Sequence, residues 1–86
     1  MRYRTEIAQR ALKALKDIPS ADRERIRLAV RALGDDARPR GCLKLQQSPN
    51  WRIRVGVYRV IYQIEEGRLL VLVVKIGHRK DVYREG

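Results

Sequence analysis

The sequence predicts an α+β domain of the order β-α-α-β-β-β, in which a helical hairpin packs on one side of a twisted antiparallel sheet. Two features predict this fold class. Between residues 7 and 33 the apolar residues recur at helical spacing, whereas from residue 42 onward they alternate with polar residues or form short apolar runs. A chain of 86 residues has room for one core, so we expect residues 1–86 to form a single domain.

The first part of the chain begins with a short strand and continues as two helices. Residues 2–7 alternate polar and apolar side chains, which is typical of a strand. The spacing then becomes helical until Ile18, where the helix must end because a residue before proline disfavours the helical backbone. Ser20 is a suitable N-cap for the second helix, and Gly34 is expected to end it.

The rest of the chain contains the remaining strands. Clear candidates cover residues 51–55, 58–64 and 69–76, with a shorter candidate at 42–45. Glu65–Arg68 is a hairpin turn in which Gly67 is expected to supply a positive φ. Strands joined by tight turns pair in antiparallel fashion, which is why we expect an antiparallel sheet.

Composition points to a basic cytoplasmic protein. The net charge of +10 favours nucleic acid, an acidic protein partner, or both. The longest apolar run, Leu69–Val74, is too short to span a membrane, and the N-terminus lacks the apolar core of a signal peptide. The single cysteine, Cys42, suits a reducing compartment. We therefore expect a cytoplasmic location and no membrane contact.

The positive charge is concentrated in one stretch without acidic residues. Between Ala37 and Ile64 the only charged residues are Arg38, Arg40, Lys44, Arg52, Arg54 and Arg59. A stretch of one sign repels itself, so it is best tolerated where a polyanion will bind. Arg52 and Arg54 alternate with apolar neighbours, which places both guanidinium groups on one face of a strand.

A second polar segment, Gly77–Arg84, directly follows the last apolar strand. It holds an imidazole, a guanidinium, an ammonium and a phenol, carried by His78, Arg79, Lys80 and Tyr83. Polar segments at strand ends often form sites, because the sheet fixes them without burying them. If the strands are antiparallel neighbours, Arg79 converges with the strand arginines on one surface.

Several other chemistries lack their residues in this sequence. A zinc site needs three or four ligands, and the chain has one histidine and one cysteine far apart. Glycine-rich phosphate loops and a serine in a nucleophile elbow are also missing. We expect neither a metal nor a cofactor. Chemistry on a phosphodiester remains, since guanidinium groups can stabilise its negative transition state and a tyrosine can stack on an unpaired base.

Four segments carry a family resemblance: Lys44-Leu45, Trp51–Gly56, Tyr58–Tyr62 and Gly77–Arg84. Behind a helical hairpin they resemble the RelE/ParE toxin superfamily, closest to its RelE side, over essentially the whole chain. The resemblance implies the RelE-like microbial RNase fold and the toxin of a type II toxin–antitoxin system. Such a toxin enters the ribosomal A site, cleaves mRNA there by 2′-hydroxyl attack without a metal ion, and is inhibited by a small antitoxin.

The resemblance also assigns the catalytic residues, position by position. Arg52 and Arg54 match the basic strand residues that RelE-like toxins use on the RNA backbone. Arg59 and Arg79 match arginines implicated in stabilising the transition state. Tyr83 matches the C-terminal tyrosine that lies beside the target nucleotide. These five residues are the expected catalytic set.

Three further residues are expected to contact RNA, and the proton acceptor stays open. The contacts are Lys44, His78 and Lys80. Arginines stand here where the best-known members have lysines, and an arginine is effectively never deprotonated. Lys44, His78 or Tyr83 would have to accept the proton, or catalysis relies on electrostatics alone.

Two other functions remain compatible with the sequence. A ParE-like toxin would poison DNA gyrase without being a nuclease, although such relatives generally lack the arginine-plus-tyrosine ending present here. A plain binding module would use its charge only to hold RNA or an acidic protein. Steep salt dependence of RNA binding without cleavage would identify the module.

Overall fold

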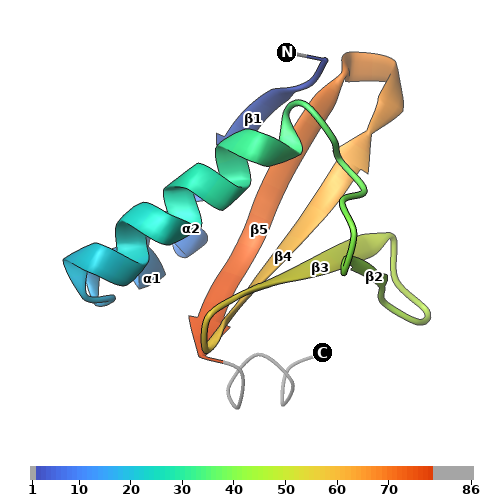
Figure 1. Ribbon diagram of the computed structural model, residues 1–86. Helices are drawn as coiled ribbons and strands as arrows, with labels where there is room; N and C mark the ends of the chain where they lie inside the picture. Colours follow the sequence, from blue (N-terminus) through green and yellow to red (C-terminus); the bar gives the residue numbers. More distant parts are fainter. Residues whose placement is uncertain (1, 79–86) are drawn as a thin grey trace.

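Five strands form one sheet, and two helices lie on one of its faces (Figure 1). The computed structural model describes residues 2–78. Along the chain the elements are β1 (Arg4–Ile7), α1 (Gln9–Lys16), α2 (Ser20–Leu33), β2 (Leu43–Lys44), β3 (Asn50–Val55), β4 (Tyr58–Glu65), the short 3₁₀ helix η1 (Glu66–Arg68) and β5 (Leu70–His78). Within this part of the chain no helix is long and apolar enough to cross a membrane.

The predicted α+β class and helical hairpin are confirmed, whereas the sheet differs from the prediction in two respects. Its strand order is β1-β5-β4-β3-β2, and the short candidate at 42–45 is a true strand, which adds one strand to the expected order. The sheet is mixed because β1 pairs with β5 in parallel. The prediction of a purely antiparallel sheet is therefore wrong for β1. Antiparallel direction follows from tight turns, and no turn joins β1 to β5.

Each helix turns one apolar face toward the sheet. Ala11 and Leu15 of α1 are buried one turn apart, and α2 contributes a buried stripe of Ile26, Val30 and Leu33. They cover Val60, Tyr62, Val71 and Val73, which are fully buried in the sheet. This core fixes which face of each strand points inward, and therefore which face is left for a site.

Two predicted local signals proved wrong, and a third was confirmed. Pro19, not Ser20, occupies the N-cap position of α2, where its extended backbone lets its carbonyl accept a hydrogen bond from the Arg23 N–H at 2.9 Å. In the β4–β5 turn the left-handed residue is Leu69, with φ 50°, and not Gly67, because η1 closes on the Leu69 N–H. Gly34 ends α2 as expected.

The connector between α2 and β2 crosses the part of the sheet that the helices leave open (Figure 1). The Tyr62 hydroxyl donates a hydrogen bond to the Ala37 carbonyl at 2.8 Å. The Arg38 guanidinium stacks over the Trp51 ring at 5.2 Å from its centroid. These contacts tie the connector to β3 and β4, so its next residues are held beside the β3 edge.

Candidate nucleic-acid interface

The sheet face opposite the helices carries three arginines. Ile53 points into the core, so its neighbours Arg52 and Arg54 on β3 point the other way. In the β3–β4 register, Arg54 stands directly opposite Arg59 of β4. The sequence prediction that these three side chains share one surface is confirmed. We call the surface formed by Arg52, Arg54 and Arg59 the arginine face.

Two of the three arginines on this face are almost fully buried. Arg52 and Arg59 are only 7% and 6% exposed, whereas Arg54 is exposed. Both buried side chains make polar or ionic contacts. Burying a guanidinium has a desolvation cost that an apolar residue would avoid. The arrangement thus gives two cations in fixed positions and one that can move to meet a ligand.

Lys75 of β5 is a fourth cation on this face, and the sequence prediction missed it. The register places Arg52, Ile61 and Lys75 in one row across the sheet, next to the row of Arg54, Arg59 and Gly77. Neither row contains an acidic residue. Partial burial, followed by the positive charge of Arg10, lowers the pKa of the Lys75 ammonium below its ordinary value of 10.5.

A register shift explains why Lys75 was missed. Val71 and Val73 point into the core, so strict alternation would send Lys75 there too. The pairing shifts between Ile61 and Tyr62, which are paired with Lys75 and Val73 respectively. A slip of one residue moves every following side chain to the other face. No signal in the sequence marks this position.

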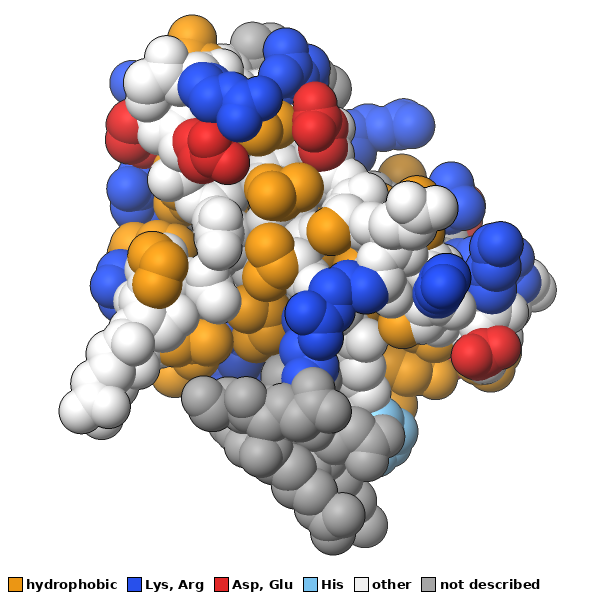
Figure 2. Space-filling model, turned by 180° about the vertical axis from the view of Figure 1, so that it is seen from behind, with side chains coloured by type: hydrophobic (Ala, Val, Ile, Leu, Met, Phe, Trp, Pro, Cys, Tyr) orange, Lys and Arg blue, Asp and Glu red, His pale blue; other side chains and the backbone are white. Residues whose placement is uncertain are grey.

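Basic and apolar side chains lie side by side on this face. Figure 2 shows the molecule from behind: one group of Lys and Arg side chains lies in the middle beside hydrophobic ones, other Lys and Arg side chains lie toward the margins, and the acidic side chains in view lie in the upper part and at the right. The exposed Leu43 of β2 extends the row of Arg52 at one edge. Such a surface suits a ligand with both phosphates and flat bases.

Two predicted RNA contacts lie elsewhere. Lys44 pairs with Trp51, so it points to the helix side of the sheet, and its Nζ donates a hydrogen bond to the Ser48 carbonyl at 2.9 Å. His78 pairs with Tyr58 on that same side, and their rings meet edge to face at 6.1 Å. The structure therefore does not bring Lys44 or His78 to the arginine face.

The remaining predicted residues, Arg79, Lys80 and Tyr83, lie outside the described residues. Among residues 2–78, no group of three or more His, Cys, Asp or Glu side chains could hold a metal ion.

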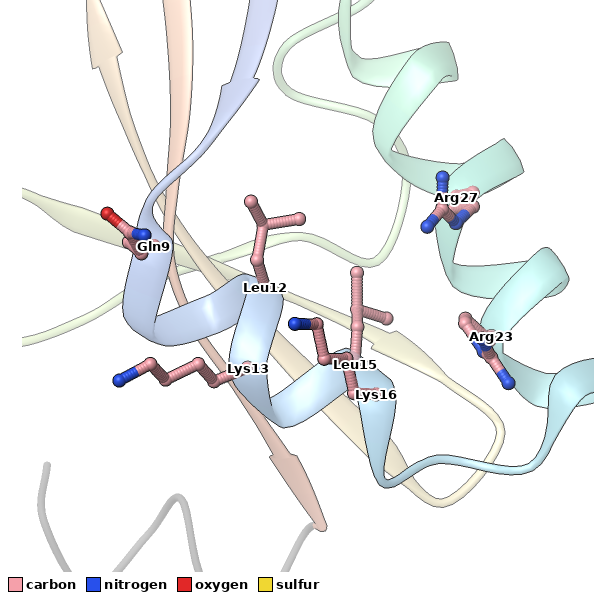
Figure 3. A pocket seen from close by; sticks show the side chains of 7 residues that line it. All are labelled: Gln9, Leu12, Lys13, Leu15, Lys16, Arg23 and Arg27. Atoms are coloured by element: carbon pink, nitrogen blue, oxygen red, sulfur yellow. The ribbon is translucent and has the colours of Figure 1, made fainter.

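A separate hollow of about 190 Å³ lies between α1 and α2 (Figure 3). Its lining combines two leucines with a glutamine and four cations: Leu12, Leu15, Gln9, Lys13, Lys16, Arg23 and Arg27. The Nε of Arg23 is buried and has no hydrogen-bond partner within residues 2–78. This surface was not predicted from the sequence, because acidic residues are interspersed with the basic ones along the same stretch. The sequence does contain a sign of it: Leu12 and Lys16, and likewise Arg23 and Arg27, are four residues apart, so each pair lies on one face of its helix.

A toxin family and two curated toxins are similar in sequence to this chain. The family described as the ParE toxin of the type II toxin–antitoxin system parDE matches residues 5–83. The protein described as toxin RelE1 of Methanocaldococcus jannaschii is 25% identical over an alignment of 88 positions, and the match covers 98% of each chain. Toxin RelG of Mycobacterium tuberculosis is 31% identical over 42 residues, about half of each chain.

Solved structures show the same fold. The match to the archaeal RelE–RelB complex from Pyrococcus horikoshii has a TM-score of 0.82 and 29% identity, covering 92% of this chain and 97% of that one. The match to the intact E. coli RelBE toxin–antitoxin complex has a TM-score of 0.78 and 25% identity, covering 88% and 95%.

Proposed function

The chain belongs to the RelE/ParE superfamily of type II toxin–antitoxin toxins, on its RelE-like side, and from this premise we propose that it is an endoribonuclease that cleaves mRNA in the ribosomal A site. The observation that carries the proposal is the cross-strand pair of Arg54 and Arg59. Neither their row nor the neighbouring row of Arg52 contains an acidic residue. The target would place the protein in the cytoplasm.

The arginine face supplies what phosphodiester cleavage needs. The ribose 2′-hydroxyl loses its proton and its oxygen attacks the adjacent phosphorus, while the bond to the 5′-oxygen breaks and that oxygen takes up a proton from solvent. Negative charge builds on the phosphoryl oxygens and the leaving oxygen. Arg59, which is almost fully buried, is fixed before RNA arrives, so it stabilises that charge with little reorganisation. The exposed Arg54 follows the phosphate, and Arg52 holds the backbone beside it. Because the arginines supply the positive charge, the reaction is expected to need no metal ion.

Lys75 is our candidate for the proton acceptor. A lysine accepts a proton only when it is neutral, and the lowered pKa of Lys75 increases that neutral fraction. The arginines cannot serve, and Lys44 and His78 point to the other side of the sheet. Tyr83 is the remaining alternative from the family resemblance.

The C-terminal segment would complete the site. By resemblance, Arg79 stabilises the transition state and Tyr83 holds the target nucleotide, while Lys80 contacts RNA. Lys44 and His78 would have to contact RNA from the margins of the strands rather than from the arginine face.

The direct test is mRNA cleavage on programmed ribosomes. Wild type should give a 2′,3′-cyclic phosphate and a 5′-hydroxyl, the products of 2′-oxygen attack. Arg59→Gln should lower the rate at least about 100-fold, the typical loss when one transition-state donor is removed. Arg31→Gln, which removes an exposed arginine from α2, is the matched control and should cleave normally. Intact mRNA with wild type would exclude the proposal, and an unimpaired Arg59→Gln would exclude the residue assignment.

A gyrase poison is the second candidate, and the match to the ParE toxin family favours it. The two are separated by adding purified toxin to gyrase and supercoiled DNA. Gyrase-linked DNA breaks with mRNA left intact would establish the ParE-like function.

An antitoxin is the proposed protein partner, because the P. horikoshii and E. coli relatives were solved as toxin–antitoxin complexes. The hollow between α1 and α2 fits a segment that is both acidic and apolar. Leu12 is 40% exposed there and could receive an aliphatic side chain, while the cations around it would pair with carboxylates (Figure 3). Such binding would also stabilise a small domain by mass action.

A further inference from the structure

The edge of β3 beside the connector is hollowed and lined by three cations. β2 pairs only with Trp51 and Arg52, so the rest of β3 extends past it. The space next to the N-terminal end of β2 has a volume of about 350 Å³ and is lined by Arg40, Gly41, Arg52, Ile53 and Arg54.

Gly41 is the reason that this space is open. If β2 continued backward in register, Gly41 would face Arg54. Its φ of +91° instead turns the chain away from the strand, and a Cβ built there would meet nothing within 4 Å. The connector therefore places Arg40 across a gap from β3 rather than against it.

The backbone of β3 offers a further donor in this gap. The Asn50 carbonyl accepts a hydrogen bond from the Leu45 N–H at 3.0 Å, so the polar groups of Asn50 point toward β2. Because orientation repeats every second residue, those of Arg52 and Arg54 point the same way. β2 begins at Leu43, opposite Arg52, and has no residue opposite Arg54. The Arg54 N–H therefore faces the hollow instead of a strand.

Charge decides what the hollow can hold. No acidic side chain lines it, and the ion pairs within residues 2–78 are formed by other side chains than Arg40 and Arg54, both of which are exposed. Guanidinium groups next to a backbone N–H are a recurrent arrangement for phosphate. The hollow is also continuous with the arginine face, because Arg54 belongs to both.

We propose that this hollow binds a backbone phosphate of single-stranded RNA that flanks the phosphate held between Arg54 and Arg59. The strand then crosses the β3 edge toward Arg40, which binds RNA without touching the scissile bond. This inference rests on the proposed RNA-directed function and extends its site to a residue outside the expected set.

The test compares two arginines that carry the same charge. The probe is a short single-stranded oligoribonucleotide with every ribose 2′-O-methylated, so that no cleavage occurs, and its binding is measured by fluorescence anisotropy at several salt concentrations. Arg40→Gln should weaken binding at least fivefold at low salt and reduce the slope of log K against log salt by about 0.7, the value for one phosphate contact on a single strand. Arg31→Gln, an equal charge change on α2, should change the slope by less than half of that.

A second measurement locates the contact. The same oligonucleotide is made with one neutral methylphosphonate at each position in turn. Wild type should be sensitive at two separated phosphates, and Arg40→Gln should lose sensitivity at one of them only. Thermal melting confirms that each variant is folded.

The outcomes separate the hollow from the proposed function. If wild type cleaves mRNA but Arg40→Gln binds RNA as Arg31→Gln does, the hollow is not an RNA subsite and the function stands. If Arg40→Gln shows the specific loss but wild type does not cleave, the subsite stands without the nuclease. A loss of affinity for the antitoxin alone would assign the hollow to a protein and overturn the proposal.

Discussion

Arg54 of β3 and Arg59 of β4 are direct cross-strand partners on the face of the sheet away from the helices. Like charges at opposed positions destabilise a sheet, and many other residue pairs would avoid that cost. The fold accepts it at the centre of a surface whose rows hold no acid. An anion bound on this face during function would lower the repulsion between the two guanidinium groups.

Arg54→Gln should therefore make the free protein more stable while it weakens the proposed activity. Relief of the repulsion between Arg54 and Arg59 is worth a few tenths of a kcal/mol, toward the lower end of the cross-strand pair range of about 0.2–1 kcal/mol, because Arg54 is exposed. Differential scanning calorimetry in low salt should show a melting temperature raised by about 1–3 °C.

Salt provides the control for Arg54→Gln. In 1 M salt, where the Debye length is only about 3 Å, the difference between variant and wild type should largely disappear. A stability gain that persists in high salt would show that packing, not repulsion from Arg59, was relieved.

Lys75→Met should change the pH dependence of both stability and cleavage. Because the folded state lowers the pKa of Lys75 below 10.5, the unfolded chain binds more protons between the two values, and wild-type stability rises with pH across that window. The stability gain of Lys75→Met should thus be largest near neutral pH and shrink toward pH 10.5. Urea unfolding at several pH values measures it.

The rate of cleavage distinguishes a catalytic Lys75 from a merely buried one. The wild-type rate should increase with pH below 10.5, and Lys75→Met should remove that increase. Lys13→Met, which removes an exposed lysine from α1, is the control. An unchanged pH–rate profile in Lys75→Met would leave the lysine a structural role only.

The parts of the site that the sequence could predict depend on local rules. Arg52 and Arg54 share a face because strand side chains alternate, and the two-residue turn at Gly56 fixes their register with Arg59. Nothing local determines that Lys75 joins them, since this depends on a register shift in the pairing of β4 with β5.

The pairing of distant strand segments could not be predicted from the sequence either. Lys44 lies in the basic stretch between Ala37 and Ile64, but its pairing with Trp51 places its side chain on the helix side of the sheet. The parallel pairing of β1 with β5 joins segments more than 60 residues apart, as the partners Arg4 and Leu70 show. Such contacts are set by the packing of the whole core, which residue spacing does not encode.

Tyr62→Phe should destabilise the fold by about 1–2 kcal/mol, since it removes a buried hydrogen bond and leaves the Ala37 carbonyl without its donor. Tyr58→Phe, at a half-buried tyrosine of the same strand, is the matched control and should cost less. Urea denaturation at neutral pH gives both free energies of unfolding.

Alkaline pH tests the same hydroxyl. Burial, followed by the neighbouring Cys42, raises the pKa of Tyr62 above its ordinary value of 10.0. Above pH 10 the unfolded chain loses this proton while the folded protein keeps it, so wild-type stability should fall as the pH rises further. The fall should be smaller in Tyr62→Phe, and an equal fall in both proteins would mean that other groups cause it.

Leu12→Glu should weaken binding of the antitoxin at least tenfold, because it places a carboxylate where the proposed acidic and apolar segment would dock between α1 and α2. Leu28→Glu is the matched control: Leu28 is also an exposed helical leucine, at 54% against 40% for Leu12, but it does not line this hollow. Isothermal titration calorimetry with the purified cognate antitoxin gives both affinities. Because both leucines are exposed and neither belongs to the buried core, neither change should unfold the protein. Equal losses of affinity would show that added negative charge, not the position of Leu12, is responsible.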